Sequence, residues 1–179
     1  MTILSIIFLS LVGLIVLLLV IGLFLKKAFH IERSILINKS KPEVYNYLRI
    51  LKNGEHFNKW TMTDPNMKKT LTGTDGTVGF TYAWDSTNKN VGAGAQEIIK
   101  LKENARIDYE LRFERPFKNT AFSSLILDDA TPGQTKVTWT FHGVMPYPFN
   151  LIHALLGLSK MLGKDLEISL LNLKKQLEK

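Results

Sequence analysis

The chain has 179 residues, with 23 Lys and Arg against 16 Asp and Glu, and a formal net charge of +7 at pH 7. It contains no cysteine, which excludes disulfides, thiol catalysis and cysteine metal sites. The positive charges are dispersed and form no basic run interleaved with aromatic residues, so no nucleic-acid partner is expected. A basic excess of this kind suits a protein that works beside an anionic membrane leaflet.

The first segment is an uncharged apolar run. Residues 3–25 carry no charged side chain, and roughly 20 apolar residues are enough to cross a hydrocarbon core of ~30 Å. No basic residue precedes the run, and bulky residues stand where signal-peptide cleavage needs small ones. We therefore predict a single-pass membrane anchor with its basic flank in residues 1–27 and a folded domain in residues 28–179. Lys26 and Lys27 follow the span, and the positive-inside rule then places the domain in the cytoplasm.

A strand and a short helix are predicted next. Residues 30–37 (HIERSILI) are rich in β-branched and aliphatic side chains, which favours a strand. Ser40, Pro42 and Glu43 form a capping-box pattern, in which the serine caps the helix, the proline fits its first turn and the glutamate reaches back. Apolar residues at helical spacing extend this helix until Asn53-Gly54 ends it.

Six further strands are predicted from alternating or β-branched runs separated by turn residues. Short connections between them indicate an antiparallel meander. In 106–114 apolar and charged residues alternate, so one face of the sheet is apolar and must be covered. Gly92-Ala93-Gly94 predicts a bulge where a strand bends, because it lacks the context of a phosphate-binding loop. The predicted strands are 68–72, 78–84, 91–101, 106–114, 120–127 and 136–142.

The stretch MPYPFNLIHALLGLSKMLGKDL, residues 145–166, is almost as apolar as the first segment. Polar residues such as Asn150 and His153 interrupt it, and its uninterrupted apolar run 154–158 is far too short to span a bilayer. Leucines recur every three or four residues over 155–177. Helical spacing starts near Phe149, after Pro146 and Pro148, and the stripe predicts one long amphipathic helix that lies on the apolar face of the sheet.

The order of these elements resembles the helix-grip fold of the SRPBCC superfamily, which includes START-like, Bet v 1-like and polyketide cyclase/dehydrase domains. The resemblance implies an α+β fold, in which a curved antiparallel sheet wraps around a long C-terminal helix, here preceded by one N-terminal transmembrane helix. The residues that carry it are Ser40-Lys41-Pro42-Glu43-Val44, Phe57 to Trp60 with Asp64-Pro65, Gly76 to Phe80, Gly92 to Gly94, Thr135 to Trp139, Gly163 to Leu166 and Leu173-Lys174.

A helix-grip domain leaves a cavity between its sheet and its long helix. The resemblance implies that this cavity binds a hydrophobic small molecule or lipid, such as an isoprenoid or polyketide-like compound. A filled core is the alternative arrangement for the same apolar side chains. The expected lining residues are Tyr82, Trp84, Tyr109, Phe113, Trp139, Phe141, Leu155, Leu158 and Leu162.

Two other functions stay open at the level of the sequence. A polyketide cyclase/dehydrase-type enzyme needs a proton-transfer group in the cavity, but Asp108 and Glu110 are predicted on the outer face and Glu97 stands alone. A protein-interaction module, like the chaperone regulators of the superfamily, would act through its outer surface. His153 is predicted either at the cavity mouth or facing solvent. We predict no catalytic constellation, no cofactor and no metal site, because the histidines do not fall at metal-ligand spacing.

Overall fold

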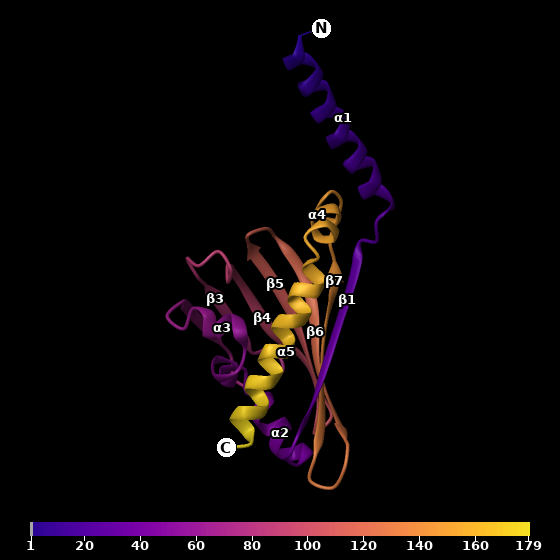
Figure 1. The fold of residues 1–179 in the computed structure, drawn as a ribbon. Coiled ribbons are helices and arrows are strands. Elements are labelled where there is room, and N and C mark those ends of the chain that lie inside the picture. The colour runs from indigo at the N-terminus through magenta and orange to yellow at the C-terminus, as the bar shows by residue number, and fades with distance from the viewer. Residues whose placement is uncertain (1) are drawn as a thin grey trace.

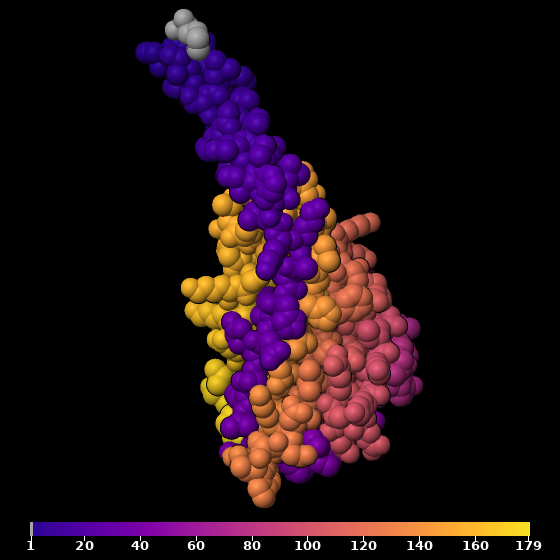
Figure 2. Space-filling view, turned by 90° about the vertical axis from the view of Figure 1, so that its right-hand side faces the viewer, coloured from indigo at the N-terminus to yellow at the C-terminus, as the bar shows by residue number. Residues whose placement is uncertain are grey.

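A curved antiparallel sheet forms the body of the computed structural model, which describes residues 2–179 (Figure 1). Its strand order is β1-β7-β6-β5-β4-β3-β2, so the first and last strands of the chain are neighbours. The predicted meander is confirmed, and Figure 2 shows β1 running along one side of the domain between α5 and β7. The strands are β1 (Ala28–Ile37), β2 (Lys68–Thr72), β3 (Thr81–Asp85), β4 (Ala93–Lys102), β5 (Arg106–Arg115), β6 (Asn119–Asp129) and β7 (Thr135–Val144).

Helices cover the concave face of this sheet and continue beyond one end of it (Figure 1). α1 projects away from the domain, and it is long and apolar enough to cross a membrane. We call the end of the domain beside α1 the α1 end. It comprises the start of β1, the end of β7, the β5–β6 hairpin and α4. The helices are α1 (Ile3–Phe24), α2 (Lys41–Leu48), the 3-10 helix η1 (Leu51–His56), α3 (Lys59–Thr63), α4 (Phe149–Leu155) and α5 (Leu158–Leu177).

The helix predicted after β1 begins as expected but ends earlier. Glu43 reaches back to Ser40, whose backbone N–H donates to its carboxylate over 3.2 Å, as the capping-box pattern predicts. The α-helix then ends at Leu48 rather than at Asn53-Gly54. The carboxylate of Asp75 accepts the backbone N–H groups of Leu51 and Lys52 at 2.8 and 3.1 Å, so it caps a separate 3-10 helix.

The prediction of one continuous C-terminal helix from near Phe149 to Leu177 is wrong, although the helical segment begins at Phe149 as expected. The chain forms two helices, and Gly157 between them has a left-handed backbone with φ of 59°. A residue without Cβ adopts this conformation at little cost, so Gly157 allows the chain to turn from α4 into α5.

The hydrophobic core lies between α5 and the sheet. Leu166, Leu170 and Leu173 of the predicted leucine stripe are each at most 2% exposed, and they belong to one core cluster with Ile107 and Val137 of the sheet. This confirms that α5 covers the apolar face. The part of the sheet that α5 covers is thus packed as a core.

Candidate ligand-binding site

A row of aromatic rings crosses the concave face at the α1 end. It runs from Phe29 on β1 to Phe141 on β7, Phe113 on β5 and Trp84 on β3. Successive ring centroids lie 5.6, 6.5 and 6.0 Å apart, which are normal separations for interacting aromatic pairs. The row skips β6 and β4, and it forms a continuous apolar floor from β1 to β3.

Small residues on neighbouring strands make room for this row. A Cβ on Gly94 would lie 2.6 Å from the carbonyl oxygen of Arg112 and 2.9 Å from the ring of Trp84. A Cβ on Gly143 would lie 3.1 Å from the ring of Phe29. β4 also changes register against β5 between Ala93 and Gly94, which confirms the predicted bulge. The two glycines therefore let large rings lie close to the backbone.

The nine expected lining residues fall into three groups. Half-buried side chains at the α1 end are Trp84, Phe113 and Phe141 in the row, and Leu158 and Leu162 on α5. Buried side chains deeper in the domain are Tyr82, Tyr109 and Trp139. Leu155 stands apart, because it lies on α4 and is 64% exposed. Solvent thus reaches the aromatic row but not the deeper aromatic residues.

Each of the three buried lining residues, Tyr82, Tyr109 and Trp139, has a hydrogen-bond partner. The indole Nε1 of Trp139 donates to Ser123 Oγ over 2.8 Å. The hydroxyl of Tyr82 donates to the Glu55 carboxylate over 3.1 Å. Burial, reinforced by this carboxylate, raises the pKa of Tyr82 far above its ordinary value. Its phenol therefore stays neutral and available as a donor.

The sequence left Glu97 as the one candidate for an acid in the cavity, and the structure places this carboxylate outside the cavity. Glu97 faces the outer surface of the sheet, where its Oε2 lies 2.8 Å from the guanidinium of Arg112. Glu55, which the sequence analysis missed, contacts the lining residue Tyr82, and its Oε2 also pairs with Lys69 Nζ at 3.0 Å. It lies on η1, far from Tyr82 in sequence, so no local pattern indicated the contact.

His153 covers the β1 end of the aromatic row. Its ring stacks on Phe29 with centroids 5.3 Å apart, and its Nε2 lies 3.3 Å from Ser159 Oγ. Burial lowers the pKa of His153 below its ordinary value of 6.5. The imidazole is therefore neutral at pH 7, and it closes one side of the row as a largely apolar ring.

We expect the domain to lose stability as the pH falls below about 6.5. The unfolded chain binds a proton at His153 more readily than the folded one, because the folded pKa is lower. Above that pH both states are neutral and the contribution is constant. His153→Gln removes this titration, so urea midpoints measured between pH 7.5 and 5.5 should fall less steeply for the variant. Parallel pH profiles for the two proteins would contradict this assignment.

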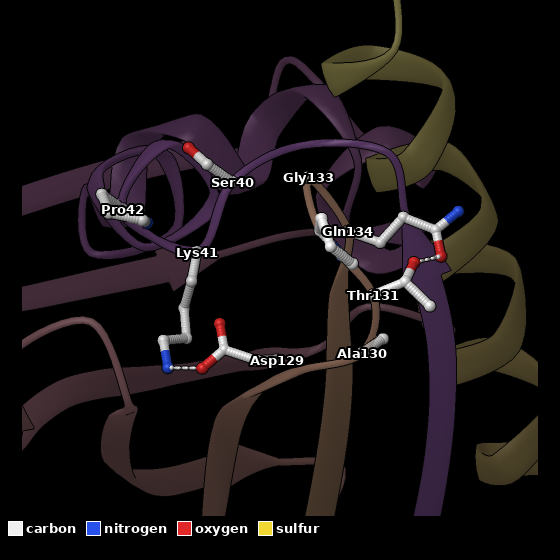
Figure 3. Close-up of a pocket in the computed structure, with 9 residues that line it drawn as sticks. Ser40, Lys41, Pro42, Asp129, Ala130, Thr131, Gly133 and Gln134 are labelled. Carbon is white, nitrogen blue, oxygen red and sulfur yellow. Dashed lines mark hydrogen bonds and ion pairs between the residues drawn. The ribbon is translucent and has the colours of Figure 1, made fainter.

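A surface hollow of about 470 Å³ lies at the opposite end of the domain (Figure 3). It is formed by the turn between β1 and α2 and by the β6–β7 hairpin. Lys41 Nζ lies 2.5 Å from Asp129 Oδ2 at its edge, and the hydroxyl of Thr131 donates to Gln134 Oε1 over 2.7 Å (Figure 3). Its lining has no aromatic residue, so it does not have the features of a site for a large apolar ligand.

A curved antiparallel sheet covered by a long C-terminal helix, with an aromatic row on the concave face, defines a helix-grip domain of the SRPBCC superfamily. A family model identifies the family within this superfamily. Residues 28–178 match the family model described as polyketide cyclase / dehydrase and lipid transport, and the chain belongs to this family. The fold and superfamily indicated by the sequence motifs are thereby confirmed.

Solved structures share this fold at low sequence identity. A hypothetical protein from Helicobacter pylori has a TM-score of 0.61 at 11% identity, over 83% of this chain and 88% of that chain. A protein from Nitrosospira multiformis gives 0.58 at 17% identity, over 83% and 96%. The protein Ara h 8.0201 gives 0.50 at 13% identity, over 80% and 98%. No curated protein matches the chain in sequence.

Proposed function

We propose that this chain is a membrane-anchored domain that binds a hydrophobic molecule, such as a lipid, isoprenoid or polyketide-like compound, on the concave face of its sheet. The aromatic row at the α1 end, in which Trp84, Phe113 and Phe141 are half-buried, is the observation that carries the proposal. Apolar ligand surface that leaves water for this site gains about 25 cal/mol per Å². The proposed contacts are Tyr82, Trp84, Tyr109, Phe113, Trp139, Phe141, Leu158 and Leu162.

The proposed anchor is α1, and residues 28–179 form the proposed binding domain. The length and uniformly apolar composition of α1 support a single span. Lys26 and Lys27 directly after the span support a cytoplasmic domain by the positive-inside rule. An anchor of this kind keeps the site beside the bilayer, where hydrophobic ligands are concentrated.

The proposal predicts that Phe113→Lys lowers ligand capture at least about fivefold, because an ammonium group on the floor must be desolvated when an apolar ligand binds. The matched control is Glu114→Lys, since the neighbouring side chain on β5 faces outward and is exposed. The full chain is inserted into vesicles that contain a photoactivatable phospholipid, and cross-linked peptides are then mapped by mass spectrometry. Circular dichroism melts of both variants check that the domain is folded.

Cross-links in peptides from β3, β5 and β7 are expected for the wild type and for Glu114→Lys. Cross-links confined to α1 and its flank in the wild-type chain would contradict ligand capture by the domain. They would instead favour a filled core and a role exerted through the outer surface. Equal cross-linking of Phe113→Lys and the wild type would place the ligand away from the aromatic row.

A further inference from the structure

Large exposed hydrophobic residues gather at the α1 end of the domain. They are 38–66% exposed, whereas those elsewhere, such as Leu36, Leu71 and Leu171, stand on separate elements. The rings of Phe117 and Phe149 stack with centroids 5.6 Å apart and connect the β5–β6 hairpin to α4. We call this set the apolar rim, and it consists of Phe117, Phe149, Ile152, Leu155, Leu156 and Met161.

α4 is held directly against the last turn of α1. The side-chain amide of Asn150 donates to the carbonyl oxygens of Gly22 and Leu25 over 2.7 and 3.2 Å, and Asn150 is only 1% exposed. A Cβ on Gly22 would lie 3.3 Å from the ring of Tyr147 and 3.4 Å from Leu151 Cβ, so the two helices touch closely. One side of α4 therefore packs on the end of the apolar helix while the rim residues on its other side stay open.

The charge around the rim is mainly positive, although exposed Glu114 and Asp85, which pairs with Arg115, lie at its border. The segments 2–31, 115–122 and 144–164, which contribute to the α1 end, contain no Asp or Glu. The sequence at the opposite end, by contrast, places Asp128 and Asp129 in the β6–β7 hairpin. The exposed lysines of the α1 end are Lys26, Lys27, Lys118, Lys160 and Lys164.

We propose that the apolar rim inserts into the boundary between headgroups and acyl chains of an anionic bilayer. This inference rests on the proposed anchoring by α1. The end of α1 marks where a span would leave the hydrocarbon core, and Asn150 fixes α4 at that level. Apolar side chains with surrounding lysines match the two parts of such an interface, its acyl boundary and its negative headgroups. The aromatic row then opens toward lipid, and a ligand passes from bilayer to floor without crossing bulk water.

The absence of native cysteine makes single-site labelling direct. Three full-length variants, Leu14→Cys, Leu156→Cys and Leu171→Cys, each replace an exposed leucine and carry an environment-sensitive fluorophore. They are reconstituted into vesicles of phosphatidylcholine with about a third phosphatidylglycerol, with and without nitroxide-labelled lipids. We expect strong quenching at position 156 by nitroxides near the headgroups and at position 14 by deep nitroxides. Position 171, on α5 far from the rim, should lose at least about threefold less fluorescence than position 156.

The outcomes distinguish failure of the rim insertion from failure of the anchoring by α1. Quenching at 14 but equal weak quenching at 156 and 171 overturns the insertion of the rim and leaves the anchor in place. No quenching at 14 overturns the anchor, and the rim proposal fails with it. A blue shift at 156 without lipid quenching shows that protein, such as a second copy of the chain, covers the rim, and this also overturns the proposal. Quenching at 156 that weakens about twofold or more in pure phosphatidylcholine supports the role of the lysines.

Discussion

Leu170→Ala is expected to lower the free energy of unfolding by about 2–5 kcal/mol, the largest stability loss predicted here. Leu170 is 1% exposed in the middle of α5, and it packs in the core cluster between this helix and the sheet. The substitution removes buried methyl groups and leaves a cavity that the neighbouring strands fill only in part. Urea unfolding of the full chain in a mild detergent, followed by circular dichroism, measures the loss.

Leu171→Ala is the matched control for this prediction. Leu171 is the next residue of the same helix and is 52% exposed, so its truncation should change stability by less than about 0.5 kcal/mol. Similar losses for the two variants would mean that α5 does not pack on the sheet through the face described above.

Asn150→Leu is expected to release α4 from α1. The variant keeps a side chain of similar size but removes the donor for the carbonyl oxygens of Gly22 and Leu25. An unsatisfied buried carbonyl costs about 1–3 kcal/mol, so local opening should become roughly tenfold more frequent or more. Tryptic cleavage after Lys26 and Lys27 in the reconstituted full chain should accelerate by that factor.

Asn172→Leu is the control for this cleavage experiment. Asn172 lies on α5 and donates to the carbonyl oxygen of Phe57 over 3.3 Å, away from α1. Its replacement removes an amide donor of the same kind without touching the junction, so cleavage after Lys26 and Lys27 should keep the wild-type rate. Equal rates for Asn150→Leu and the wild type would show that Asn150 does not restrain the junction.

Much of the fold was predictable because its signals are local. Alternation along residues 106–114 identified the inward face of β5, where Ile107 and Tyr109 are buried and Leu111 and Phe113 are half-buried. The capping box identified the start of α2. These patterns depend on neighbours within a few residues, and the tertiary structure reinforces them.

The site was less predictable, because it depends on strand register and on contacts between distant residues. Gly94 lies beneath Trp84 only because β3 and β4 pair in one particular register. The side-chain amide of Asn150 donates a hydrogen bond to a residue more than a hundred positions away in the sequence. A single polar residue in an apolar stretch does not indicate which residue it contacts. Leu155 was expected on the cavity wall, since the left-handed turn at Gly157 that separates α4 from α5 was not anticipated.

The pairing of β1 with β7 has a consequence for biogenesis. Three residues separate α1 from β1, and the partner strand of β1 is not completed until Val144 has been synthesised. At roughly 5–20 residues per second, the ribosome needs several seconds or more to supply that partner. During this time the strand next to α1 has an unpaired edge, which is a template for aggregation. Nascent chains that stop before β7 should therefore remain open and sensitive to proteases, even when α1 and β1 are complete.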